Sequence, residues 1–171
     1  RDLLDFYVEA VKTRSYSDQE GELAQKLLAK MKELEYDEAY VDAAGNVCGR
    51  VGCGGKVIHF DSHMDTVLAE NAAEWKHPPF AGEIEDGMLY GRGTDDDKGP
   101  VAAVLLAMKA VRDLKLPLTK NVRLIAGTDE ETGFRDIKWY YGSHPYAPHT
   151  LSPDADFPII NLEKGHYQPT F

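Results

Sequence analysis

The sequence predicts an α/β protein in which helices lie on the faces of a central sheet. Short apolar runs typical of strands alternate along the chain with longer segments whose apolar residues recur every three or four positions. This alternation favours a sheet covered by helices. With 171 residues, of which 43% are hydrophobic and 28% charged, the chain has the size and composition of a globular protein with a buried core.

The N-terminal segment predicts two helices. Residues 2–13 place leucine, aromatic, alanine and valine side chains at helical spacing. Ser17 and Glu20 have the spacing of a capping box, in which the serine oxygen accepts a backbone N–H and the glutamate reaches back. A second helix is therefore expected to begin there and to run to about residue 35.

The following segment predicts strands and turns. In chain order, the expected elements are a hairpin of residues 39–42 and 47–51, a buried strand over 56–61, a polar and proline-containing loop over 62–80, and a second hairpin over 83–90. Strand-forming residues therefore dominate the middle of the chain.

The last part of the chain begins with an apolar helix over 100–114, where Pro100 suits the first turn because its missing N–H would be unpaired there anyway. After it we expect a strand over 121–127, a short helix over 134–141, a loop over 141–152 and a last strand over 157–162.

Charge and composition exclude several kinds of partner. The net charge is −10 and the lysines and arginines do not cluster, so neither nucleic acid nor an anionic membrane is an expected partner. No apolar run reaches the roughly 18–20 residues of a membrane span, and the N-terminus lacks a signal-peptide core. Cys48 and Cys53 do not have zinc-knuckle spacing and are expected to be reduced thiols of a cytoplasmic protein.

Four groups of acidic residues stand at predicted strand ends or in loops. They are His63 with Asp65, the aspartates at 95–97, the acids at 129–131, and Asp154 with Asp156. Each group alone has an ordinary explanation, such as a local hydrogen bond, a helix N-terminus that favours acids, or a solvated loop. Because crevices in α/β proteins lie at the carboxyl ends of strands, the groups could converge there, and they would then repel one another unless cations neutralised them.

The residue types narrow the choice of cation. Carboxylates with one imidazole suit zinc, manganese or cobalt, whereas calcium prefers oxygen ligands alone. An EF-hand is excluded because its order of acids is missing, and residues 52–56 (GCGGK) lack the first glycine of a P-loop and precede a strand. An acidic scaffold that binds no metal is an alternative.

The adjacent Glu130 and Glu131 indicate divided roles. Neighbouring side chains cannot both chelate one metal in the same way, so one can bind a metal while the other takes a proton from a water. In a two-metal site, with ions about 3.5–4 Å apart, one carboxylate bridges the pair.

Four stretches resemble the M20 family of metallopeptidases, and within it the PepV-like dipeptidases. They are HFDSHMDTV (59–67), LYGRGTDDDKGP (89–100), LIAGTDEETGF (124–134) and SPDADFPIINLEKG (152–165). The resemblance implies a three-layer α/β/α, zinc-peptidase-like catalytic domain with a central mixed sheet. It also implies that residues 1–171 are the N-terminal portion of that domain. The lid or dimerisation domain, through which a homodimer could form, and the C-terminal catalytic segment would then be absent.

The resemblance also implies a role for each matching residue. His63 and Asp154 resemble ligands of one zinc, with Asp156 as the alternative to Asp154. Asp65 resembles the residue that orients the His63 ring. Glycines 91, 93 and 99 with Lys98 set a register in which Asp96 is the carboxylate that bridges two zincs, with Asp95 and Asp97 as supporting neighbours.

Glu130 resembles the family's general base and Glu131 a ligand of the second zinc. A cis peptide bond often follows the bridging aspartate, so one is expected between Asp96 and Asp97. The remaining histidines match no ligand motif and are expected to be structural or exposed: His59, His77, His144, His149 and His166.

The function that the resemblance implies is a dizinc hydrolase that cleaves the amide bond of dipeptides with a metal-bridging water and Glu130 as base. Manganese or cobalt could substitute for zinc. One alternative is a deacylase of N-acyl amino acids in the same family. Another is an inactive metal-binding fragment, because the second zinc site lacks a histidine that lies outside this stretch in the family.

Overall fold

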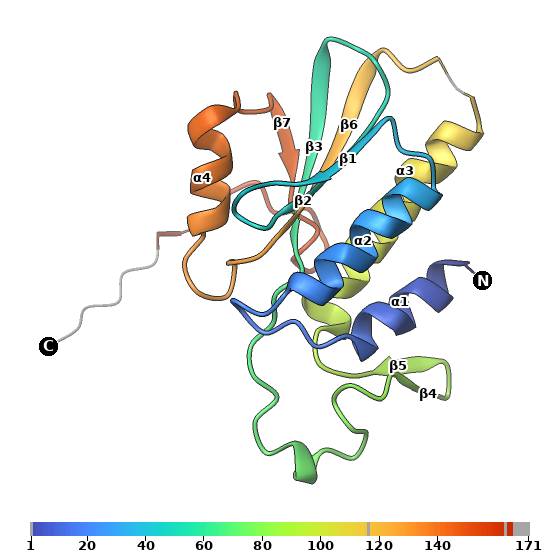
Figure 1. The fold of residues 1–171 in the computed structure, drawn as a ribbon, viewed down its shortest axis with the longest axis vertical. Helices are drawn as coiled ribbons and strands as arrows, with labels where there is room; N and C mark the ends of the chain where they lie inside the picture. The colour runs from blue at the N-terminus through green and yellow to red at the C-terminus, as the bar shows by residue number, and fades with distance from the viewer. Residues whose placement is uncertain (1, 116, 163, 166–171) are drawn as a thin grey trace, which may run out of the picture.

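The computed structural model describes residues 2–115, 117–162 and 164–165, and its centre is a mixed sheet of five strands in the order β1-β2-β6-β3-β7 (Figure 1). The strands are β1 (Glu38–Val41), β2 (Val47–Val51), β3 (Lys56–His63), β6 (Lys120–Gly127) and β7 (His149–Leu151). Strands β1, β2 and β6 pair antiparallel, whereas β3 pairs parallel with both β6 and β7. A separate ribbon contains β4 (Glu83–Glu85) and β5 (Met88–Tyr90).

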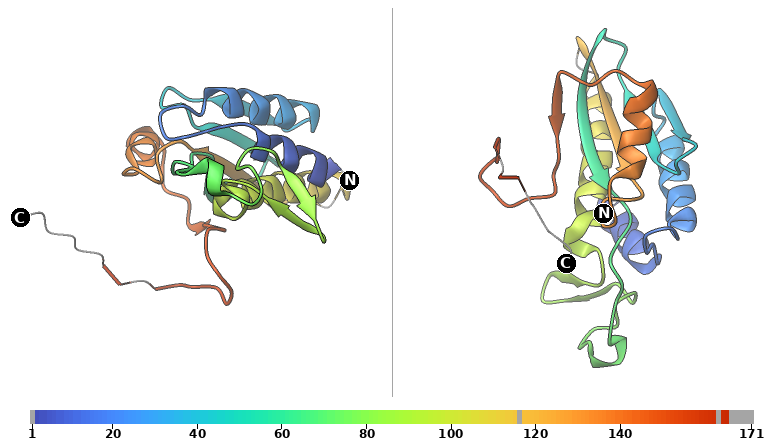
Figure 2. Two further views of the ribbon diagram at one scale, coloured as in Figure 1. Left: turned by 90° about the horizontal axis from the view of Figure 1, so that it is seen from below. Right: turned by 90° about the vertical axis from the view of Figure 1, so that its left-hand side faces the viewer.

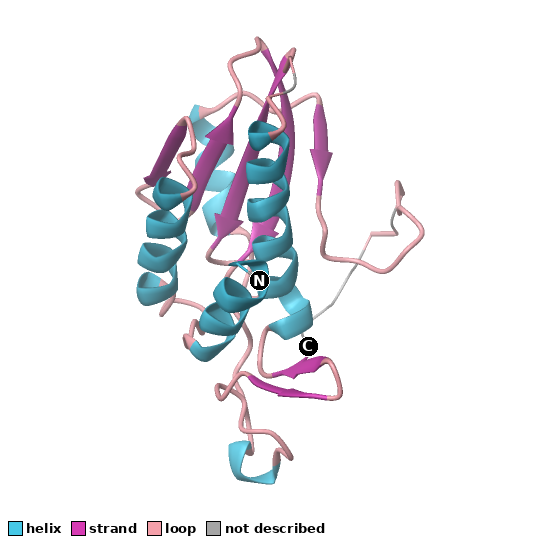
Figure 3. Cartoon of the chain, turned by 90° about the vertical axis from the view of Figure 1, so that its right-hand side faces the viewer, coloured by secondary structure: helices cyan, strands magenta, loops and turns pink. Residues whose placement is uncertain are grey.

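Helices cover both faces of the sheet. On one face lie α1 (Asp2–Lys12), α2 (Gly21–Glu33) and α3 (Gly99–Asp113), which Figure 3 shows in front of the strands. The other face carries α4 (Arg135–Ser143), which is in front in the right-hand view of Figure 2. A short helical turn, η1 (Ala72–Glu74), interrupts the loop after β3. The predicted three-layer α/β/α architecture with a mixed sheet is therefore confirmed.

The main hydrophobic core lies between the sheet and α1–α3. Leu124 and Ala126 of β6 point into it because alternate residues of a strand face the same side. From the helices come large buried side chains at helical spacing: Phe6, Leu23, Leu27, Met31, Leu105 and Met108. Burial of each such side chain contributes about 1.5–3 kcal/mol relative to exposure, so this layer holds most of the fold's stability.

The layer between the sheet and α4 is smaller and more polar. Its apolar part contains Cys48, Ile125 and Tyr140. Beside it, the fully buried His59 accepts a hydrogen bond at Nδ1 from Nε of Arg123, 2.9 Å away. Burial and the charge of Arg123 lower the pKa of His59 to about 3, so this imidazole is neutral at physiological pH.

Most of the predicted elements are confirmed within one or two residues, and three predictions were wrong. Residues 141–152, expected to form a loop, contain the end of α4 and all of β7. Residues 157–162, expected to form a strand, do not pair with any strand in the described part of the chain, and Phe157 is 93% exposed. Apolar residues predict a strand only where a neighbouring strand can satisfy its backbone groups.

The third incorrect prediction is the capping box. Helix α2 begins at Gly21 with Glu20 at the N-cap position, and no side chain caps it. The hydroxyl of Ser17 donates instead to Asp65, which is distant in sequence.

No helix of residues 2–115, 117–162 and 164–165 has the length and apolar character needed to cross a membrane. Glu163 of the fourth matching stretch and His166 lie outside the described residues.

Candidate metal centre

His63 is the last residue of β3, at the carboxyl edge of the sheet, where it pairs with Gly127 of the parallel strand β6. Its side chain is almost fully buried. Ring Nδ1 lies 3.0 Å from the backbone oxygen of Asp65 and 3.3 Å from its Oδ1. This contact orients the ring so that Nε2 points toward the loops at the sheet edge.

Asp65 is completely buried and ties three segments together. Its Oδ2 accepts hydrogen bonds from Ser17 Oγ at 2.8 Å and from the backbone N–H of Glu131 at 3.3 Å. Its Oδ1 accepts one from the N–H of Glu130, also at 3.3 Å. Burial alone would raise the pKa of Asp65, but the hydrogen bonds from His63 and Ser17 outweigh burial and lower it. Asp65 is therefore an ionised anchor for both His63 and the glutamate pair.

The turn Thr94–Lys98 carries the three aspartates. It starts from Gly93, whose φ of +82° and whose close approach to Thr66, 2.8 Å from where a Cβ would lie, both require glycine. The peptide bond between Asp96 and Asp97 is cis, which confirms the expectation drawn from the family resemblance. At the end of the turn, the buried Lys98 donates through Nζ to the carbonyl of Thr13 at 2.7 Å.

The aspartates of this turn have different environments. Asp97 is fully buried, and its Oδ2 accepts hydrogen bonds from the hydroxyl of Ser62 and from the backbone N–H of His63. Burial raises the pKa of Asp97 to about 7, although these hydrogen bonds oppose the increase. Asp95 and Asp96 are both exposed. The Asp96 side chain, 61% exposed, reaches the sheet edge.

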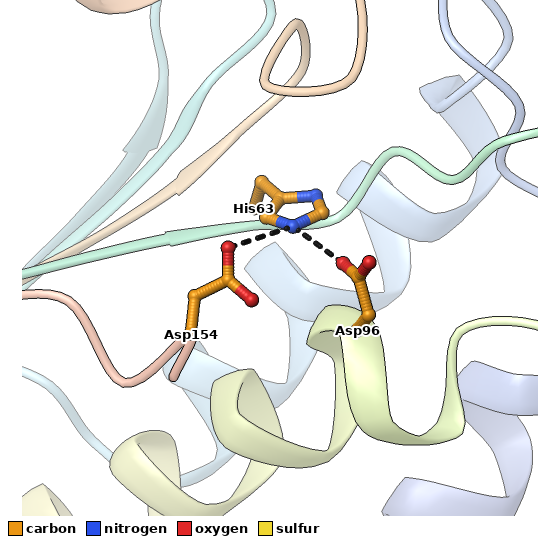
Figure 4. A group of neighbouring side chains, drawn as sticks. All are labelled: His63, Asp96 and Asp154. Atoms are coloured by element: carbon orange, nitrogen blue, oxygen red, sulfur yellow. Dashed lines mark ion pairs between the residues drawn. The ribbon is translucent and has the colours of Figure 1, made fainter. Parts of the chain in front are cut away.

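Two carboxylates flank the free nitrogen of His63 (Figure 4). His63 Nε2 lies 2.9 Å from Asp96 Oδ1 and 3.6 Å from Asp154 Oδ2, which comes from the segment after β7. In the part of the chain that the structure describes, these three residues are the one group whose potential ligand atoms all lie within 4.8 Å of one another. Asp156, the alternative ligand, is exposed and does not join the group.

The group fits a divalent cation. His63 Nε2 is buried and has no hydrogen-bond partner of good geometry among the described residues, although two carboxylates face it. Burial lowers the pKa of His63, but the hydrogen bond to Asp65 and the surrounding carboxylates raise it to about 10. These acids therefore favour a positive charge at the ring, which a bound ion can supply in place of a proton. One nitrogen and two oxygens suit zinc, manganese or cobalt.

The two glutamates lie beside this group but outside it. Glu130 Oε2 is 4.0 Å from His63 Nε2. The Glu131 carboxylate accepts a hydrogen bond from the backbone N–H of Val67 at 3.2 Å. Burial and neighbouring acids raise the pKa of both glutamates, with the positive charge of His63 opposing the increase. The structure therefore brings His63, Asp65, Asp96, Glu130 and Asp154 together and leaves Glu131 at the margin.

Two cavities adjoin the centre. One, of about 330 Å³, is lined by His63, Glu130 and Asp154 and also by Asp61 and Asp136. The other, of about 700 Å³, lies on the Glu131 side and is lined by Tyr16, Ser17, Val67, Trp75, Arg92 and Glu131. Arg92 lies over the Trp75 ring, 5.1 Å from its centre.

Sequence reasoning missed Ser17, Asp61 and Asp136. No local pattern marks Ser17 as a partner of Asp65, because the two residues are 48 positions apart. Strand alternation could have indicated Asp61, since it stands two residues before His63 and therefore faces the same side of the sheet. Asp136 offered no comparable signal because it lies in the first turn of a helix, where acids are common.

The other histidines agree with the expected structural roles where the structure describes them. His59 is buried against Arg123, and His77 stacks on Tyr90 beside Glu83. His144 stacks on Tyr140, and His149 is an exposed residue of β7.

The chain is similar to known peptidases in sequence. The model of Peptidase family M20/M25/M40 matches residues 59–170. The protein named "Putative dipeptidase YtjP" of Bacillus subtilis is 45% identical over 150 residues, which are 85% of this chain and 32% of that protein. The Beta-Ala-Xaa dipeptidase of Lactobacillus delbrueckii subsp. lactis is 38% identical over 148 residues, 85% of this chain and 31% of its own length.

The fold is similar to solved structures as well. The M20 family metallo-carboxypeptidase Sso-CP2 from Sulfolobus solfataricus superposes with a TM-score of 0.81 at 26% identity, over 90% of this chain and 37% of that protein. Aminopeptidase PepT from Bacillus cereus has a TM-score of 0.72 at 25% identity, over 91% and 43%. This chain spans about a third of the length of the curated relatives it matches.

Proposed function

Because the chain belongs to Peptidase family M20/M25/M40, with the family match covering residues 59–170, we propose that it carries the metal ligands and general base of a dizinc dipeptidase. The observation that carries the proposal is the buried His63 Nε2 between the carboxylates of Asp96 and Asp154. Residues 1–171 are proposed as the N-terminal portion of the catalytic domain, since they span about a third of the relatives. The activity is proposed for the whole protein.

In this proposal each residue of the centre has one role. His63 and Asp154 would hold the first zinc, Asp96 would be the carboxylate shared with the second, and Glu131 would be a ligand of the second. Asp65 fixes the ring of His63 through the contact at Nδ1. When bound, the ions would supply Lewis acidity toward the scissile carbonyl and the attacking water. Manganese or cobalt could replace zinc because both accept nitrogen and carboxylate ligands.

Glu130 is proposed as the general base. Its carboxylate lies 4.0 Å from His63 Nε2, near the centre but outside the ligand group, and it is therefore free to hold a water. It would take the proton of the attacking water and then deliver that proton to the leaving amine. Positioned acid–base catalysis of this kind contributes about 10²–10⁴-fold in rate.

The proposed substrate is a dipeptide or a similar small peptide. Proteins named as dipeptidases are among the relatives with the highest identity, and cavities suited to small molecules adjoin the centre. A deacylase of N-acyl amino acids would need a cavity that accepts an uncharged acyl group. The cytoplasm is the proposed compartment because both cysteines are free thiols.

Residues 1–171 alone are proposed to be poorly active. Among the described residues, the candidate ligands of the second zinc are Asp96 and Glu131, and Glu131 lies outside the compact ligand group. A catalytic zinc commonly has three protein ligands, so this second site is short of at least one.

The test is Glu130→Gln in the protein with a complete catalytic domain. We expect kcat to fall at least about 100-fold, because the base is lost, while zinc content stays unchanged. The matched control is Glu131→Gln at the neighbouring position, which should lower zinc content as well as kcat. Turnover by Glu130→Gln close to that of the unchanged protein would refute the general-base role.

A further inference from the structure

The cavity of about 330 Å³ beside the candidate centre contains two acids that the proposed chemistry does not use, Asp61 and Asp136. We propose that these carboxylates bind the ammonium group of the substrate's N-terminal residue. The inference rests on the proposed function and deepens it, because it names the feature by which the protein would distinguish a free peptide from an N-acylated one.

The position of Asp61 follows from the strand that carries His63. Residues 59, 61 and 63 of β3 point to the α4 side of the sheet, since side chains alternate along a strand. Asp61 is therefore the neighbour of His63 on the same face of β3, two residues before it in the sequence. His63, Glu130, Asp154 and Asp61 all line this one cavity.

Asp136 reaches the cavity from the first turn of α4, across Gly127. A Cβ on Gly127 would lie 2.6 Å from Asp136 Oδ2, so the absence of a side chain there admits the carboxylate. Gly127 is the register partner of His63, which places Asp136 over the same end of the sheet.

Asp136 has an unused acceptor. Its side chain is only 4% exposed, and Oδ2 accepts a hydrogen bond from the backbone N–H of Thr128 at 2.8 Å. Oδ1 is buried and has no hydrogen-bond partner among the described residues. A buried carboxylate oxygen without a donor costs free energy, so a ligand that brings a donor to this point would relieve that cost.

The charge of the cavity selects the ligand. Among the described residues, its lining contains the carboxylates of Asp61, Glu130, Asp136 and Asp154, and its single basic side chain is the imidazole of His63. Arg123, a nearby cation of the α4 layer, donates to His59 and acts on Asp61 through its charge, but its side chain is not part of the cavity lining. A primary ammonium supplies three donors and a positive charge, whereas an acyl cap supplies neither. The cavity should therefore favour a free amino terminus.

The experiment measures binding of three small ligands to the zinc-loaded chain by titration of the backbone amide NMR signals of Gly127 and Thr128. Alanine and propionate differ only in the α-ammonium group, and β-alanine carries the ammonium one carbon further out. None of them has an amide bond, so hydrolysis does not enter the measurement. The same ligands are titrated into Asp136→Asn, Asp61→Asn and the control Asp113→Asn, which removes an exposed charge at the end of α3.

We expect the unchanged chain to bind at least one of the amino acids about tenfold or more tightly than propionate, as for a charge-assisted hydrogen bond. Asp136→Asn, which can still accept from Thr128, and Asp61→Asn should remove that preference, and Asp113→Asn should keep it. Whichever amino acid binds better shows whether an α- or a β-ammonium fits.

Three results would overturn the inference: equal binding of alanine, β-alanine and propionate, no millimolar binding of either amino acid, or an undiminished preference in Asp136→Asn. None of these results bears on the Glu130 test, which measures turnover. A failure of this inference is therefore distinguishable from a failure of the proposed function.

Discussion

The two faces of the central sheet have different chemistry. Between the sheet and α1–α3 lies the large hydrophobic core, and buried polar residues such as Ser62 and Asp97 meet at its edge, where β3 ends. The α4 face instead buries His59 with Arg123 and leads along β3 to Asp61 and His63. A single strand supplies both, because its residues alternate between the two sides. The apolar face can stabilise the fold while the polar face positions ionisable groups at the sheet edge, where the candidate centre lies.

The largest expected effect is on the free energy of unfolding, for two neighbouring residues of one strand that face opposite sides of the sheet. Leu124 and Ile125 are neighbours in β6, both completely buried, but Leu124 faces the α1–α3 core and Ile125 faces α4. We expect Leu124→Ala to lower the free energy of unfolding by about 3–5 kcal/mol through lost burial and a dry cavity. Ile125→Ala should cost less, about 2–3 kcal/mol, because water can enter a cavity beside polar groups. Urea unfolding of both variants measures the difference, and a larger loss for Ile125→Ala would contradict this view of the two faces.

The second expected effect is a pH dependence of the free energy of unfolding, which originates in a residue of the α4 face. The pKa of the neutral, buried His59 is lowered to about 3 in the folded chain, whereas in the unfolded chain it has its ordinary value of 6.5. Below pH 6.5 the unfolded state therefore binds a proton that the folded state does not. Stability should consequently fall as the pH decreases toward 3, by up to about 1.4 kcal/mol per pH unit from this group.

The variant His59→Gln tests this dependence, since glutamine can still accept from Arg123 but does not titrate. We expect its unfolding free energy, measured in urea between pH 7 and 4, to decline less steeply than that of the unchanged metal-free chain. Parallel declines would show that His59 does not carry the difference.

A smaller effect, on zinc affinity, is expected when the residues that orient His63 are replaced. Asp65→Asn removes the charge that faces Nδ1, and we expect zinc affinity to fall about 10–100-fold, as is typical for the loss of a residue that orients a ligand. Ser17→Ala removes one of several hydrogen bonds to Asp65, so its effect should be smaller, about threefold to tenfold. Competition with a chromogenic chelator measures both affinities. A larger loss of zinc affinity for Ser17→Ala than for Asp65→Asn would show that Ser17 does not act on His63 through Asp65.

Much of the fold could be predicted from periodicity. Helices α1–α3 and strands β2, β3 and β6 follow long apolar patterns that tertiary contacts reinforce. Strand β7 could not be predicted, because its three residues are exposed and its pairing with β3 leaves no local signal. The prediction of a strand over residues 157–162 was wrong for the opposite reason. The segment is apolar, but a strand also requires a neighbouring strand to pair with, and apolar character alone does not supply one.

The proximity of three candidate ligands could be predicted from the family motifs. His63, Asp96 and Asp154 come from three distant segments, and only the motifs indicated that they would meet. Within the run at 95–97, the motif register distinguished Asp96 from Asp97, and the structure separates the two as an outward side chain and a buried one. Ser17 and Asp136 were not predictable, because their roles depend on packing between elements rather than on local sequence.

The most direct test of the central claim, that His63, Asp96 and Asp154 hold a metal, is a zinc titration of the chain with Asp154→Ala and, as its matched control, Asp156→Ala. Calorimetry should show that Asp154→Ala loses affinity by more than the roughly 10–100-fold typical of a supporting residue, because a ligand has been removed. Asp156→Ala should bind zinc as the unchanged chain does, since Asp156 lies outside the ligand group. Equal affinities for all three proteins, or a greater loss in Asp156→Ala, would contradict the account.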